Sequence, residues 1–164
     1  MLPAPIPAND AERLAALYAL LLLDTPPEER FDKIVEFAAR EFDVPIALIS
    51  LIDADRQWFK ANVGLEGTCE TGRDISFCGH AILRAEIMMV PDALQDARFA
   101  DNPLVTGPPH IRFYAGAPLI LPNGYALGTL CLIDTRPRRL DDVELAILST
   151  LRSLVLQELE RQHG

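Results

Sequence analysis

The sequence has few of the residues that build disulfide frameworks and structural metal sites. Its 164 residues include three cysteines, an odd number without Cys-x-x-Cys spacing, and three histidines that stand far apart. These counts argue against a disulfide-stabilised domain and against a zinc site. We therefore expect reduced thiols, no bound metal and no other cofactor.

Long apolar stretches and a basic surplus are also missing. The run Leu20–Leu23 has four residues, against the roughly 20 that a membrane span needs. The first ten residues contain no basic side chain, so they do not resemble a secretory signal. Acidic side chains outnumber basic ones 24 to 15, for a formal net charge of -9, which repels nucleic acid and anionic membranes. The sequence predicts a cytoplasmic protein with neither of those partners.

The common catalytic and nucleotide-binding motifs do not occur. There is no Gly-x-x-x-x-Gly-Lys, Gly-x-Gly-x-x-Gly, His-Glu-x-x-His or Gly-x-Ser-x-Gly sequence. We therefore predict no catalytic residues and a protein without catalysis of its own.

The sequence contains helix and strand patterns in number and length suited to a single domain. Three of the first seven residues are proline, which predicts an extended lead over residues 1–9, followed by a single domain over 10–164. An Asn-Gly step at 123–124 between two apolar runs is a strong hairpin signal. The expected elements are helices at 10–22, about 31–42, 77–84 and 140–161, and strands at 46–52, 56–63, 87–90, 111–121 and 125–134. This order predicts an α+β fold, with an antiparallel sheet between helices and loops.

The two terminal helices carry leucines on more than one side. Exposing that surface to water would forfeit about 25 cal/mol per Å² that self-association recovers. We expect a homodimer formed through these helices. The alternative is that the two helices cover each other within a monomer.

Six segments carry a resemblance to a known family. FDKIVEFAAREFDVPIALISLI at 31–52 is followed by DRQWFKANVGL, SFCGHAIL, DARFADNPLV, IRFYAGAPL and LGTLCLID. In this order they resemble a GAF domain, of the bacterial type placed ahead of histidine kinase or diguanylate cyclase output domains. The resemblance implies a profilin-like central antiparallel sheet, with the terminal helices on one face and loops plus a short helix over a pocket on the other.

The same resemblance implies a function. GAF modules of this type are sensors in two-component or cyclic di-GMP signalling, and they bind a small molecule and transmit through a helical dimer. We expect that role here, with an unidentified ligand. A dimerisation domain without a ligand remains an alternative.

Three groups of polar and aromatic residues are candidates for the ligand site. One lies at the start of the predicted 77–84 helix, where free backbone N–H groups can hold an anion and lower the pKa of a thiol. The second lies on the 91–109 loop, and the third on the 56–63 and 111–121 strands. The candidate ligand-binding residues are Trp58, Ser76, Phe77, Cys78, His80, Asp92, Asp96, Arg98, Phe99, Asn102, Arg112 and Tyr114.

Each group also has a purely structural interpretation. Phe77 and Cys78 could be core residues, because free cysteine is among the most buried residue types. The Asp and Asn side chains of the loop could bind local backbone, and Arg98 could pair with an acid. Arg112 and Tyr114 could belong to an ordinary half-buried strand.

Three special members of the family can be weighed on single residues. Bilin-binding GAF domains carry Cys followed directly by His, whereas Gly79 separates Cys78 from His80 here. The Asn-Lys and Phe-Asp-Glu pattern of cyclic-nucleotide GAF domains is not found. A free methionine-R-sulfoxide reductase remains the enzymatic alternative, because Cys69 and Cys78 resemble part of its thiol arrangement, although Cys131 falls in a predicted strand.

Overall fold

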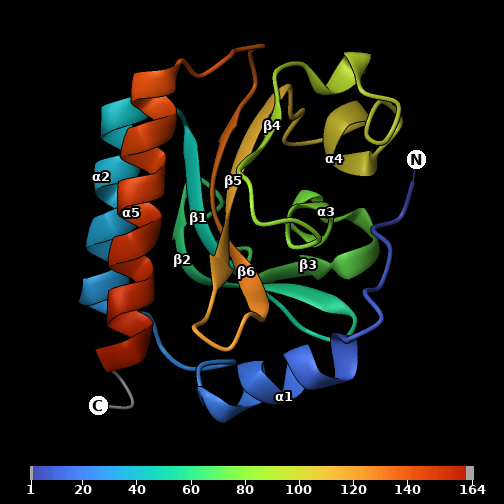
Figure 1. Ribbon diagram of the computed structural model, residues 1–164. Coiled ribbons are helices and arrows are strands. Elements are labelled where there is room, and N and C mark those ends of the chain that lie inside the picture. Colours follow the sequence, from blue (N-terminus) through green and yellow to red (C-terminus); the bar gives the residue numbers. More distant parts are fainter. Residues whose placement is uncertain (1, 162–164) are drawn as a thin grey trace.

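The computed structural model describes residues 2–161 and contains a six-stranded antiparallel sheet in the order β3-β2-β1-β6-β5-β4 (Figure 1). The sheet is built from two hairpins, β1–β2 and β5–β6, whose inner strands β1 and β6 pair at its centre. The strands are β1 (Ile46–Ile52), β2 (Arg56–Val63), β3 (Glu70–Gly72), β4 (Met88–Val90), β5 (Phe113–Ile120) and β6 (Ala126–Asp134). The helices are α1 (Asp10–Ala19), α2 (Glu29–Phe42), η1 (Arg73–Ile75), α3 (Phe77–Ala81), η2 (Ala93–Gln95), α4 (Pro103–Thr106) and α5 (Asp142–Arg161).

Helices α2 and α5 lie side by side and cover one face of the sheet (Figure 1). Phe31, Val35 and Phe42 recur at three- and four-residue spacing in α2, so they form one buried stripe. Leu148 and Val155 supply the matching stripe of α5. The main hydrophobic core therefore lies between these helices and the sheet.

The opposite face of the sheet is covered by α3, η2, α4 and their connections (Figure 1). Side chains of a strand alternate between faces, and β5 shows this directly. Phe113 packs in the core under α2 and α5, whereas Tyr114 packs in a second core under α3 and α4.

The central strands approach each other closely at Gly128. Gly128 of β6 is paired with Leu51 of β1, and a Cβ built at this position would lie 1.8 Å from the carbonyl oxygen of Ser50. No side chain fits there, so glycine is required for the β1–β6 pairing.

Helix α1 crosses one end of the sheet (Figure 1). It ends at Ala19, three residues earlier than predicted, because Leu21 adopts a left-handed backbone with φ of 55°. Leu20 and Leu22 are buried while Leu21 is exposed. Helix α5 therefore packs along α2. The alternative in which α1 and α5 cover each other differs from this arrangement.

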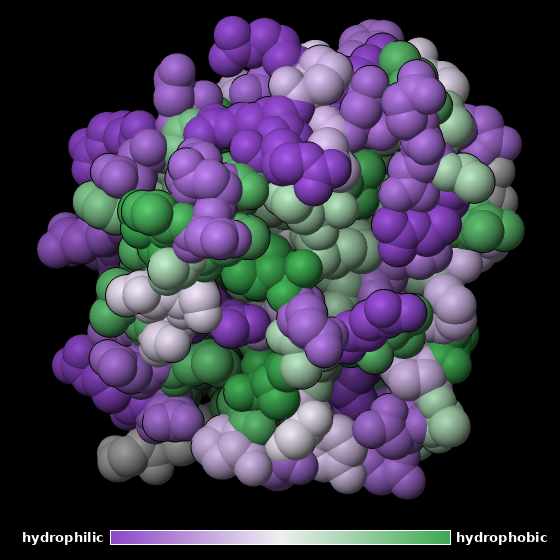
Figure 2. All heavy atoms as spheres, turned by 45° about the horizontal axis from the view of Figure 1, so that its top comes forward, coloured by the Kyte–Doolittle hydropathy of each residue, from purple (hydrophilic) through white to green (hydrophobic). Residues whose placement is uncertain are grey.

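Several apolar side chains of residues 2–161 are exposed outside these contacts. Figure 2 shows hydrophobic residues in separate groups between hydrophilic ones on the face in view. The large hydrophobic residues that are exposed are Leu2, Ile6, Tyr18, Leu21, Phe37, Leu83, Leu94, Val143 and Leu154. Within residues 2–161, no helix combines the length and the apolar character needed to cross a bilayer.

The α+β prediction with a central antiparallel sheet is confirmed. The differences are short elements. β3 lies between the predicted 56–63 strand and the predicted 77–84 helix, α4 lies in the 91–109 loop, and α3 ends at Ala81 instead of residue 84. Three- and four-residue elements are too short to show a period, so tertiary contacts determine them. The last three residues of the predicted 10–164 domain, and residue 1 of the predicted lead, lie outside the described residues.

Candidate functional site

The space between the sheet and α3 is filled by aromatic side chains. The rings of Phe77 and Phe99 stack with centroids 4.0 Å apart, and the ring of Tyr114 lies 5.2 Å from Phe77. All three side chains are buried. Stacked aromatic pairs contribute about 1 kcal/mol beyond the area that they bury, so these three predicted ligand residues hold α3 and the loop of Phe99 onto the sheet.

A buried thiol pair lies next to this aromatic group. The Sγ atoms of Cys78 and Cys131 are 3.9 Å apart, and Cys78 Sγ accepts hydrogen bonds from Tyr114 Oη at 3.1 Å and Thr129 Oγ1 at 3.0 Å. Burial raises the pKa of Cys78, but the hydrogen bonds from Cys131, Thr129 and Tyr114 outweigh it and lower the pKa to about 7. The hydrogen bond with Cys78, together with burial, raises the pKa of Cys131 well above its usual range.

This pairing differs from the one that the reductase alternative requires. Cys69 is exposed, and its carbonyl oxygen accepts a hydrogen bond from the amide of Phe59 at the edge of the sheet. Cys78 instead faces Cys131 in the interior. The close thiol pair is therefore Cys78 with Cys131, and sequence reasoning missed it because β6 and α3 are adjacent only in the folded chain.

Several other predicted site residues hold backbone in place. Ser76 Oγ accepts from the amide of Gly79 at 3.0 Å and donates to Gln57 Oε1, so it caps α3 and occupies the helix N-terminus that an anion would need. Asp92 caps η2, and Asn102 caps α4 while its amide binds the Ile75 carbonyl. These loops are fixed by their own polar side chains.

The side chains of Arg112 and Trp58 also contact the protein's own backbone and core. Arg112 Nη1 donates to the carbonyl oxygens of Val105 and Ile111, which joins the segment just before β5 to α4. Trp58 is buried on the α2 side of the sheet, away from the loops, whereas its neighbour Phe59 is buried on the loop side.

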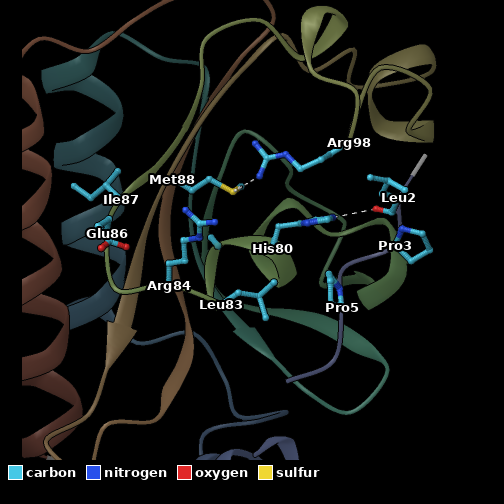
Figure 3. Close-up of a pocket in the computed structure, with 11 residues that line it drawn as sticks. Leu2, Pro3, Pro5, His80, Leu83, Arg84, Glu86, Ile87, Met88 and Arg98 are labelled. Carbon is cyan, nitrogen blue, oxygen red and sulfur yellow. Dashed lines mark hydrogen bonds between the residues drawn. The ribbon is translucent and has the colours of Figure 1, made fainter. Parts of the chain in front are cut away.

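A cavity lies at the rim of the second core, where three segments distant in sequence meet (Figure 3). It measures about 600 Å³, and we call it the rim cavity. Of the twelve predicted ligand residues, His80 and Arg98 line it. The residues around it are Leu2, Pro3, Pro5, His80, Ala81, Leu83, Arg84, Glu86, Ile87, Met88 and Arg98.

The N-terminal lead forms one wall of the rim cavity (Figure 3). His80 Nε2 donates to the Leu2 carbonyl oxygen at 3.0 Å, and the Leu2 amide donates to the Arg98 carbonyl. Ala4 is buried against Gly79, where an added Cβ would lie 2.9 Å from the Ala4 Cβ. The missing side chain at Gly79 therefore lets the lead pack directly on α3.

Arg98 is held in a fixed direction toward the rim cavity. Its Nε and Nη2 donate to the two carboxylate oxygens of Asp96 at 3.0 and 2.8 Å, and its guanidinium lies 4.9 Å from the Phe99 ring centroid. The hydrogen bond to Arg98 lowers the pKa of Asp96, so the pair stays ionised. Its remaining nitrogen, Nη1, turns to the sulfur of Met88 at 3.6 Å (Figure 3).

Arg84 points toward the same space from the turn after α3 (Figure 3). Within residues 2–161 its guanidinium makes no hydrogen bond or ion pair. Arg84, Glu86 and Met88 were not among the predicted site residues. The sequence around them does not indicate a ligand site. Arg84, for example, reads as an exposed arginine near the end of a short predicted helix, which is ordinary for a protein surface.

The chain matches the family model described as "GAF domain" over residues 26–159. It belongs to the GAF domain family. The fold agrees: the GAF domain of an Acinetobacter phosphoenolpyruvate-protein phosphotransferase has a TM-score of 0.65 at 19% identity, covering 93% of this chain and 95% of that one. A type II free methionine-R-sulfoxide reductase from Thermoplasma acidophilum has a TM-score of 0.66 at 13% identity, over 80% and 91% of the two chains. At these identities the likeness concerns the fold alone.

One curated relative is much closer in sequence. A Pseudomonas aeruginosa protein named cyclic di-GMP phosphodiesterase is 44% identical over 160 residues, which is 97% of this GAF chain. The chain spans 27% of that relative's length. This finding corrects the prediction of a protein without catalysis, because the shared sequence belongs to a protein named as an enzyme. Together with the family it supports a regulatory or sensory GAF module.

Proposed function

We propose that this chain is the regulatory GAF module of an enzyme that hydrolyses cyclic di-GMP. The observation that carries the proposal is the 44% identity to the Pseudomonas aeruginosa phosphodiesterase, which extends over 97% of the chain but only 27% of that protein. Such a partial match suits a module that accompanies a catalytic region. Three unpaired thiols suit a cytoplasmic location.

The proposed sensory element is the rim cavity. The loop that carries Arg84 and Glu86 also carries Ala85, whose carbonyl oxygen accepts a hydrogen bond from Arg152 of α5 at 3.4 Å. A ligand that prefers one arrangement of this loop would therefore act on α5 through a direct contact. Only a difference in affinity between two arrangements can drive such a shift.

The proposed output is the layer formed by α2 and α5. Phe37 of α2 and Leu154 of α5 are 44% and 41% exposed, and Val143 is 68% exposed. These side chains are available to a second copy of the chain, which supports the homodimer proposal. Light scattering of Leu154→Lys against the unaltered chain tests it: we expect a dimer that the lysine weakens, and a monomer at high micromolar concentration would contradict the proposal.

An exchange experiment tests the regulatory assignment. This chain replaces the matching 160-residue segment of the Pseudomonas aeruginosa phosphodiesterase, and hydrolysis of cyclic di-GMP is measured for the parent, the chimera and a protein lacking the segment. We expect the chimera to hydrolyse cyclic di-GMP and the deletion to change the rate by more than the exchange does. A deletion that behaves like the parent would contradict a regulatory role.

A further inference from the structure

We propose that the rim cavity binds an organic anion, a small molecule that joins a phosphate or carboxylate to an apolar body. This inference rests on the proposed sensory function and names the ligand class for it. The cavity's volume of about 600 Å³ falls within the usual range for small-molecule sites.

The charge of the cavity differs from that of the protein. The chain has a formal net charge of -9, yet the cavity is lined by two arginines and a single acidic residue, Glu86. Arg84 and Arg98 reach it from different segments, one from the turn after α3 and one from the loop after η2 (Figure 3). Asp96 balances the charge of Arg98, so the positive charge of Arg84 is the one available to attract an anion at this place.

Both guanidinium groups have N–H donors to offer. Asp96 accepts from Nε and Nη2 of Arg98, which leaves Nη1 beside Met88. Arg84 makes no ion pair within the described part of the chain. The planar donor set of arginine matches carboxylate and phosphate oxygens, so an anionic group between Arg84 and Arg98 Nη1 would be bound from two sides.

The other walls are apolar. Leu2, Pro3, Leu83, Ile87 and Met88 supply aliphatic surface next to the two arginines. Methionine adapts its shape to different apolar ligands. A free inorganic ion would leave this surface exposed to water, whereas an anion with a hydrocarbon or aromatic portion would cover it.

The first test uses 8-anilinonaphthalene-1-sulfonate, an aromatic anion, and N-phenyl-1-naphthylamine, its neutral analogue without the sulfonate. Fluorescence titration of the 164-residue chain should give saturable binding of the anion at one site. We expect Arg84→Gln to lower the affinity for the anion about tenfold, as for loss of a charged hydrogen bond. The affinity for the neutral probe should change by no more than about twofold. Glu86→Gln, which removes a negative charge from the cavity, should raise the affinity for the anion about threefold.

Matched controls separate binding from folding. Arg139→Gln removes an exposed arginine outside the cavity and should leave both probes unchanged, and urea midpoints of all variants should agree with the unaltered chain. An equal loss of affinity for the anion in Arg84→Gln and Arg139→Gln would overturn the proposal. So would an Arg84→Gln variant that binds both probes like the unaltered chain.

Competition identifies the anionic group. Phenyl phosphate and phenylacetate carry the two candidate groups on the same aromatic body, and each is titrated against the bound sulfonate probe. Displacement by either supports the site, and the stronger competitor names the group. Failure of both at millimolar concentration would overturn the ligand class. A deletion that changes the hydrolysis rate by more than the exchange does would still support the regulatory role.

Discussion

The carboxylate of Asp10 accepts two hydrogen bonds from the guanidinium of Arg73, at 2.8 and 3.0 Å, and so ties α1 to the turn η1 that precedes α3. Arg13 donates to the same carboxylate from the next turn of α1 at 2.9 Å. Both arginines are almost fully buried. One carboxylate therefore pairs with two buried cations at the contact between the first helix and the sheet.

Replacing Asp10 by Asn should lower the free energy of unfolding by about 2 kcal/mol at pH 7, between the values for exposed and buried ion pairs. The hydrogen bond from Arg73 lowers the pKa of Asp10 below 3.8. Its stabilisation is therefore complete above that value and is lost as the pH falls through the lowered pKa. Urea unfolding against pH should show the two proteins converging in acid. Glu12→Gln, an exposed change in the same helix, should cost little at any pH.

His80 should make the protein less stable in mild acid. Burial lowers the pKa of His80 below its usual 6.5, although the hydrogen bond to Leu2 opposes the shift. As the pH falls below 6.5 the unfolded chain takes up a proton that the folded chain resists, so unfolding is favoured. Between pH 7 and pH 5, His80→Gln should lose less stability than the unaltered chain. Parallel stability curves for the two proteins would contradict the assignment.

Gly128→Ala should destabilise the protein by about 3 kcal/mol, the upper part of the range for overpacking, because the new methyl group meets backbone and not a movable side chain. Gly67→Ala is the comparison. Gly67 has φ of 90° with open space around it, so alanine there adds backbone strain without a clash and should cost about 1 kcal/mol. Chemical denaturation of both variants measures the difference. An equal loss of unfolding free energy in the two variants would contradict the close approach of β1 and β6 at Gly128.

The three cysteines should differ in reactivity by burial and not by acidity. Hydrogen bonds lower the pKa of Cys78 to about 7, yet Cys78 and Cys131 are buried while Cys69 is exposed. Alkylation of the folded chain followed by mass spectrometry should add one label, on Cys69, and denaturant should allow three. Labelling of Cys78 at the rate of Cys69 in the folded chain would show that the interior opens readily.

The main elements of the fold could be predicted because their patterns are long. The stripe from Phe31 to Phe42 and the unbroken apolar strand Ile46–Ile52 allow one interpretation each, and Asn123–Gly124 marks the turn between β5 and β6. Elements such as β3 and α4 could not be predicted, since pairing with β2 and capping by Asn102 define them.

The site was harder to predict because its residues come from three separate segments. His80 and Arg98 were chosen as polar residues near a short helix and on a long loop, and both line the rim cavity. Phe77, Phe99 and Tyr114 were chosen by the same reasoning, but they stack in the interior. Residue type alone could not separate these outcomes, because an aromatic ring suits a core and a ligand site equally well.

The position of Leu2 has a practical consequence for work with this protein. Its amide and carbonyl groups bind Arg98 and His80, so the second residue of the chain is part of a cavity wall. An affinity tag attached to the amino terminus would begin one residue from that wall and would add bulk and charge beside it. Purification through the carboxyl terminus keeps ligand measurements free of this interference.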